Sequence, residues 1–132
     1  YAILSYPAGK WADRVGLKTV FIGGLIIFSF VYAGFSISNH PLTLLILFVF
    51  YGLYAAATES IAKAWISNIV PSQETASAIG FYGSLQSLCA LLASSLCGLL
   101  WMKWGSQAAL LITATGTIVV ISYFLLMVKS AD

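Results

Sequence analysis

The stretch GKWADRVGLK, residues 9–18, places Lys10, Asp13, Arg14 and Lys18 close together between two apolar segments. Only 8% of the whole chain is charged, against about 25% in an ordinary soluble domain. Hydrophobic residues make up 61% of the chain, and the mean hydropathy is +0.97. This composition is typical of a membrane protein. We therefore expect the charged stretch to be a loop at the membrane surface.

Four long apolar runs follow this loop, at residues 17–37, 42–69, 76–100 and 108–128. Each reaches the roughly 20 residues that a helix needs to cross a hydrocarbon core about 30 Å thick. A membrane β-barrel would instead show short segments of alternating polarity. The sequence therefore predicts an all-α, polytopic transmembrane helix bundle. Residues 1–8 are interpreted as the end of a fifth helix whose beginning is missing, so we expect the chain to be a fragment.

Basic residues indicate how the helices are oriented. The loop at 9–18 holds three of them and the C-terminal tail holds Lys129, whereas Lys103 stands alone in the turn at 101–107. Lys and Arg accumulate in cytoplasmic loops. The loop at 9–18 and the C-terminus are therefore predicted to be cytoplasmic, in an integral protein of the bacterial inner membrane.

The two glycines of the charged loop predict a tight turn between antiparallel helices, because Gly9 and Gly16 accept backbone angles that other residues avoid. The carboxylate of Asp13 could accept N–H bonds at the N-terminus of a neighbouring helix. Alternatively, Asp13 and Arg14 only fix the topology and prevent the helices from sliding. From the residues alone, both interpretations stand.

The order Gly9, three residues, Asp13-Arg14, one residue, Gly16 and then Lys18 resembles the signature loop of the major facilitator superfamily of secondary transporters. The resemblance implies that this loop is a gate. Asp13 and Arg14 would lock the cytoplasmic sides of two helix bundles together in one state and release them in the other. The partner of the gate would belong to an N-terminal half that is missing from this chain.

The resemblance continues along the chain. Residues 51–71 are similar to the tenth helix of that family, residues 76–88 to the start of the eleventh, and residues 98–105 to the turn into the twelfth. This implies that residues 1–132 are the C-terminal part of such a transporter, from the end of helix eight to helix twelve. It also implies transport by alternating access.

Glu59 and Lys63 are the charged pair within an apolar run, at 42–69. An ionisable side chain at the centre of a membrane helix costs roughly 2.5–3.5 kcal/mol, so it normally faces a bundle interior or water. Glu59 is therefore predicted either to take up a proton or contact a cationic substrate, or to pair with Lys63 and fix helix packing. Gly52 and Ala56 lie on the same helical face and predict close packing there.

Small side chains recur every three or four residues along 76–100. They are Ala76, Gly80, Gly83, Ser87, Ala90, Ser94 and Gly98. Small residues let membrane helices approach closely, which predicts packing against a neighbouring helix. The alternative is that this stripe lines a polar cavity, with Gln86 at its margin and Ser87 on it as candidate substrate contacts.

Three tyrosines, Tyr51, Tyr54 and Tyr82, could add aromatic contacts to a substrate, or equally could be lipid-facing or core residues. The sequence contains no metal-ligand spacing, phosphate-binding loop or nucleophile with a base, so neither an enzyme nor a cofactor is expected. A net charge of +2 with short loops gives no case for nucleic acid. The expected partners are the lipid bilayer, the missing half, protons and a small organic substrate.

Two functions from different classes are compatible with these residues. The first is alternating-access transport of a small organic molecule, proton-coupled and directed to drug efflux, in which the fragment alone is inactive. The second is a self-contained four-helix membrane protein that acts as an oligomer, either as a small multidrug pump or as a structural or assembly subunit. The length of 132 residues and the small-residue stripe suit the second idea.

Overall fold

The computed structural model describes residues 2–127, and this part of the chain is all-α. Its helices are α1 (Ala2–Val15), α2 (Leu17–Ile37), α3 (Pro41–Ile69) and α4 (Thr75–Met127). The described residues contain no strand, which confirms the predicted fold class. By length and composition, α2, α3 and α4 can each cross a membrane. The last residue of the run at 108–128 and Lys129 lie outside the described residues.

The predicted loop at 9–18 is wrong in its extent, because α1 continues through Val15 and α2 begins at Leu17. The N–H of Gly16 still donates a hydrogen bond of 2.9 Å to the carbonyl oxygen of Ala12. The chain changes direction at Gly16 alone, with φ 91° and ψ 142°. Gly9 lies inside α1 and makes no turn. Charged side chains can extend to the membrane surface from a helix as readily as from a loop. The concentration of charge at 9–18 therefore did not show that the backbone there is irregular.

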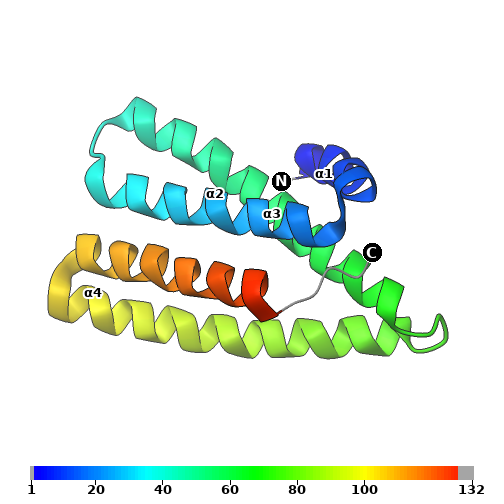
Figure 1. The fold of residues 1–132 in the computed structure, drawn as a ribbon. Helices are drawn as coiled ribbons and strands as arrows, with labels where there is room; N and C mark the ends of the chain where they lie inside the picture. Colours follow the sequence, from blue (N-terminus) through cyan, green and yellow to red (C-terminus); the bar gives the residue numbers. More distant parts are fainter. Residues whose placement is uncertain (1, 128–132) are drawn as a thin grey trace.

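A single glycine also divides α4. Gly105 has φ 83° and ψ 170°, and the helix doubles back there into two antiparallel limbs, residues 75–104 and 106–127 (Figure 1). The sequence predicted two helices separated by a longer turn at 101–107. The residues of that turn are helical apart from Gly105, because one residue with positive φ is enough to reverse the chain.

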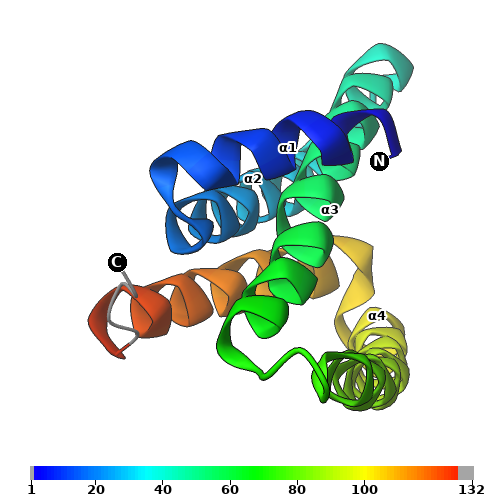
Figure 2. The same cartoon turned by 90° about the vertical axis from the view of Figure 1, so that its right-hand side faces the viewer.

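Helix α2 occupies the centre of the bundle. It packs along α3 on one side and along the second limb of α4 on the other, while α1 crosses over α2 and α3 (Figures 1 and 2). Two hydrogen bonds join α2 to α4: the Ser29 hydroxyl donates to the carbonyl of Ala114 at 3.0 Å, and the Ser36 hydroxyl donates to that of Gln107 at 3.1 Å. Hydroxyl bonds of this kind connect helices in an apolar environment.

Helices α2 and α3 approach each other closely at Gly24. A Cβ atom at Gly24 would lie 2.8 Å from Cγ2 of Thr58 and 3.1 Å from Cβ of Ala57, so only glycine allows this approach. Ala57 and Ile61 are buried nearby. This contact sets the distance between α2 and α3, the two helices that carry most of the candidate functional site.

Candidate functional site

A partly polar pocket of about 330 Å³ lies between α2, α3 and the first limb of α4. Its lining combines aromatic rings with one carboxylate and one amide. The residues are Phe21, Leu25, Tyr51, Tyr54, Ala55, Thr58, Glu59, Tyr82 and Gln86. Pockets that combine apolar and aromatic walls with a few convergent polar groups are typical of small-molecule sites.

Glu59 provides the negative charge of the pocket. Its Oε1 accepts a hydrogen bond of 3.2 Å from Nζ of Lys63, one helical turn further along α3. The Glu59 side chain is 40% exposed in this structure. Glu59 stands ten residues before the end of α3 at Ile69, which corresponds to about 15 Å along the axis. The carboxylate therefore lies well inside the length of a membrane-crossing helix.

Aromatic rings form one side of this pocket and continue beyond it. The rings of Tyr51 and Tyr54 are 5.5 Å apart, and Tyr54 also contacts Phe28 of α2 at 4.6 Å between ring centroids. Tyr32 lies 6.4 Å from Tyr51. Ring faces carry negative quadrupole potential and attract cations. Next to a carboxylate, such a cluster can bind an organic cation by charge and by ring contact together.

The candidate substrate residues from the sequence do not all meet. Gln86 and Glu59 line the same pocket, although they come from different helices. Lys63 pairs with Glu59 but is not among the lining residues. Ser87 points elsewhere: its hydroxyl is exposed and donates at 2.9 Å to the carbonyl of Gly83 in its own helix. Thus Glu59 and Gln86 are brought together, and Ser87 stays apart.

The small-residue stripe of α4 is largely exposed in this structure. A Cβ atom at Gly80, Gly83 or Gly98 would meet no atom within 4 Å, so no described helix packs closely on these glycines. At one end, Ser94 and Gly98 line a second cavity, of about 670 Å³, near Phe28 and Tyr32. On α3, Ala56 is fully buried and Gly52 is half-buried. The packing role of the stripe stays a prediction.

The charged residues of the sequence motif gather around the junction of α1 and α2. Asp13 and Arg14 are exposed in the last turn of α1, Gly16 forms the junction, and Lys18 lies in the first turn of α2. The gate role of Asp13 and Arg14 stays a prediction.

Sequence reasoning missed four lining residues of the pocket, namely Phe21, Leu25, Ala55 and Thr58. Thr58 directly precedes Glu59 in the sequence, so its position next to that candidate residue could have indicated that it lines the pocket. Its hydroxyl, however, donates to the carbonyl of Tyr54 at 2.9 Å. The run at 17–37 is apolar all around, and such a helix carries no pattern that identifies its pocket-facing side.

Together, these helices and their pocket define a polytopic membrane protein with a candidate small-molecule site between helices. The family model described as Major Facilitator Superfamily matches residues 1–132. The chain therefore belongs to the major facilitator superfamily, a family of membrane transport proteins rather than of enzymes. This confirms the resemblance that began at the charged stretch.

One relative with a curated description is an uncharacterized MFS-type transporter of Methanocaldococcus jannaschii. It is 33% identical to this chain over 101 residues, which cover 76% of this chain and 25% of that relative. The chain thus matches about a quarter of the length of the relative. No solved structure matches the chain.

Proposed function

We propose that residues 1–132 form the C-terminal transmembrane helices of a secondary transporter that moves a small organic molecule by alternating access. The family and the quarter-length match to a longer relative support this proposal. In such transporters, two bundles rock around a site near the midplane. The second bundle would be an N-terminal half outside this chain, and the fragment alone would be inactive because its cavity would open to lipid.

The pocket containing Glu59 carries the proposal for the site. Glu59 would bind a proton or the cationic part of a substrate, Gln86 would supply a hydrogen bond, and the tyrosines would contact an apolar or aromatic portion. The observation that supports this assignment is the convergence of a carboxylate, an amide and three tyrosines in one pocket from two helices. Drug efflux fits this chemistry, since lipophilic organic cations combine charge with an apolar surface.

Proton coupling would operate through the Glu59–Lys63 pair. When Glu59 is ionised, it accepts the hydrogen bond from Lys63. Protonation removes the negative charge, and Lys63 can then extend toward the membrane surface. Proton binding and substrate binding would therefore compete for the same carboxylate. The alternative is that the pair only stabilises α3.

Asp13 and Arg14 are proposed as gate residues, with Gly9, Gly16 and Lys18 shaping the same end of the bundle. Their exposure leaves both side chains accessible to a helix of the other bundle. This proposal places the α1–α2 junction and the C-terminus in the cytoplasm and the protein in a bacterial inner membrane, on the basis of the basic residues near that junction.

The experiment that tests this function compares the complete gene product with its Glu59→Gln variant in proton-driven efflux of several lipophilic cations from vesicles. Glu74→Gln is the matched control, because Glu74 is exposed in the turn before α4 and does not line the pocket. We expect Glu59→Gln to abolish coupled efflux while Glu74→Gln retains it. Full efflux by Glu59→Gln, at equal protein amount, would assign Glu59 to helix packing instead.

The second candidate is the self-contained four-helix protein that acts as an oligomer. The exposed stripe of α4 favours it, since a second copy could pack on these small side chains. The two candidates differ in the coding sequence upstream of Tyr1. An open reading frame that extends for a further half-transporter supports the first candidate, and a start codon immediately before Tyr1 supports the second.

A further inference from the structure

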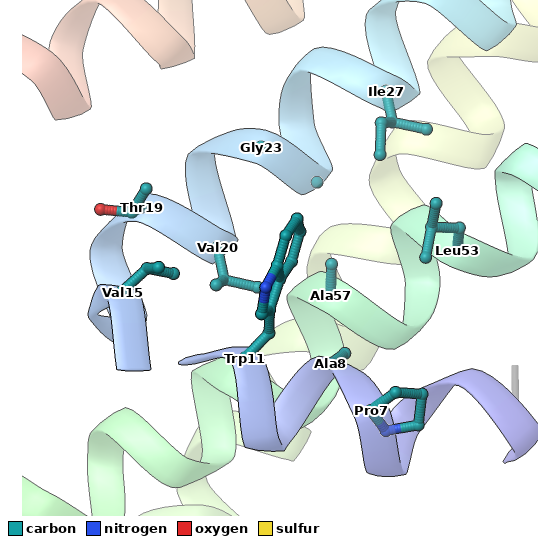
Figure 3. A pocket seen from close by; sticks show the side chains of 11 residues that line it. Pro7, Ala8, Trp11, Val15, Thr19, Val20, Gly23, Ile27, Leu53 and Ala57 are labelled. Atoms are coloured by element: carbon teal, nitrogen blue, oxygen red, sulfur yellow. The ribbon is translucent and has the colours of Figure 1, made fainter. Parts of the chain in front are cut away.

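An apolar groove of about 590 Å³ lies between α1, α2 and α3, apart from the pocket of Glu59. In Figure 3, the indole of Trp11 extends from α1 toward α2, near Val20 and below Gly23, while Ile27 and Leu53 lie at the opposite end. The lining is almost entirely apolar. A Cβ atom at Gly23 would meet nothing within 4 Å, so the groove is open at this point.

The length of the groove matches one leaflet of a bilayer. Along α2 the lining extends from Thr19 to Ile27, a distance of about 12 Å at 1.5 Å per residue. Half of a hydrocarbon core is about 15 Å. Ile27 stands at the middle of α2, so the groove reaches from the α1–α2 junction to the centre of a membrane-crossing helix.

A smaller basic pocket of about 200 Å³ adjoins the groove at that junction. It is lined by Pro7, Lys10, Trp11 and Arg14, and Pro7 and Trp11 also line the groove. Positions 7, 10, 11 and 14 follow the pattern i, i+3, i+4, i+7, so they share one face of α1. Lys10 and Arg14 are exposed, and neither forms an ion pair with a described residue. Asp13, also exposed, is the neighbouring acid on α1.

We propose that the groove and the basic pocket together bind one anionic phospholipid. One acyl chain lies in the groove, and the phosphate lies between Lys10 and Arg14 in the state of the proposed transporter in which the gate is released and Arg14 does not contact the other bundle. Guanidinium and ammonium groups bind phosphate by charge-assisted hydrogen bonds. Trp11 stands between the two cavities, as indoles do at the boundary of headgroups and hydrocarbon. The positive charge of the basic pocket complements an anionic headgroup. A neutral lipid or an apolar protein segment would not match this charge.

The test measures quenching of Trp11 fluorescence in the complete gene product by brominated lipids. The protein is placed in phosphatidylcholine vesicles that contain increasing amounts of brominated phosphatidylglycerol or brominated phosphatidylcholine. Subtracting the signal of Trp11→Phe isolates Trp11. Each basic residue near an anionic membrane surface contributes about fivefold in binding. With Asp13 nearby, we expect about a tenfold preference for the anionic lipid.

Two sets of variants separate the two parts of the site. The double variant Lys10→Gln/Arg14→Gln should remove the tenfold preference, and Lys103→Gln, outside both cavities, should retain it. Gly23→Phe should fill the groove and reduce quenching by both lipids. Gly116→Phe is its control, since a Cβ at Gly116 also meets nothing within 4 Å and Gly116 lies outside the groove.

Three results would overturn the proposal. Equal quenching by both brominated lipids would identify ordinary annular lipid without a specific site. Absence of quenching by either lipid would show that a protein segment fills the groove. A tenfold preference that persists in Lys10→Gln/Arg14→Gln would place the anionic headgroup elsewhere on the protein.

Discussion

Two adjacent glycines of α2 have opposite environments. A Cβ atom at Gly24 would lie 2.8 Å from Thr58, whereas one at Gly23 would meet no atom within 4 Å. Thr58 cannot easily move away, because its side chain is β-branched and its hydroxyl already donates to the carbonyl of Tyr54. At Gly34, a Cβ would meet the flexible end of Leu47 at 2.8 Å instead. Identical residues in one helix thus have different structural importance.

Gly24→Ala is expected to destabilise the protein by about 1–3 kcal/mol, the usual cost of overpacking. Gly34→Ala should cost less, since Leu47 can change rotamer, and Gly23→Ala should be neutral or slightly stabilising because alanine is the better helix former. Thermal unfolding in detergent, followed by circular dichroism, measures this order. Equal midpoints for Gly24→Ala and Gly23→Ala would contradict the packing seen between α2 and α3.

At the scale of the elements, two single-residue junctions set the directions of the helices. Gly16 joins α1 to α2 with φ 91°, and Gly105 joins the limbs of α4 with φ 83° and ψ 170°. The conformation at Gly105 belongs to a region that is essentially restricted to glycine. Each junction has no additional loop residue to absorb strain, so a side chain at either position must distort the adjoining helices.

Gly105→Ala is therefore expected to cost roughly 1–3 kcal/mol from backbone strain. Gly116→Ala in the second limb of α4 is the control, because Gly116 does not have positive φ and a Cβ there has free space. The measurement is the midpoint of thermal unfolding for both variants, together with the yield of monodisperse protein. If Gly105→Ala unfolds at the same temperature as Gly116→Ala, the reversal of α4 does not depend on this conformation.

At the scale of the whole molecule, the position of α2 between α3 and the second limb of α4 leaves the first limb of α4 widely exposed. In the proposed transporter, this exposed side and the pocket of Glu59 would face the cavity between two bundles. Gln86 lies in the pocket on the first limb. Gly116 is exposed on the second limb, away from the pocket.

A cysteine at Gln86 should therefore react with a water-soluble maleimide in the membrane-embedded complete protein, whereas a cysteine at Gly116, exposed on a side that would face lipid, should not. Both substitutions are made in a background with Cys89→Ser and Cys97→Ser. A transported substrate should slow the labelling of Gln86→Cys severalfold by occupying the pocket. Equal labelling rates for Gln86→Cys and Gly116→Cys would show that the pocket does not open to water.

Several features could be predicted from the residues without knowing which helices are in contact. The apolar runs predicted an all-α membrane fold because backbone groups in lipid must pair within each segment. The motif at 9–18 indicated the family, and the cost of an intramembrane charge singled out Glu59. The extent of the turns was not predictable, since charged residues mark the membrane surface without showing whether the backbone there is helical. Gly16 alone changes the direction of the chain between α1 and α2, and Gly105 alone reverses it within α4.

The sequence by itself therefore determined the helical class, the approximate helix positions and the family, because each rests on local composition or on a short motif. Only the tertiary structure decided that Glu59 shares a pocket with Gln86, that Gly24 rather than Gly23 allows close packing, and that an apolar groove meets Lys10 and Arg14. The physical reason is that a helix apolar on every side carries no periodic signal for its contacting face. Which faces meet depends on the shapes and hydrogen bonds of all neighbouring helices at once.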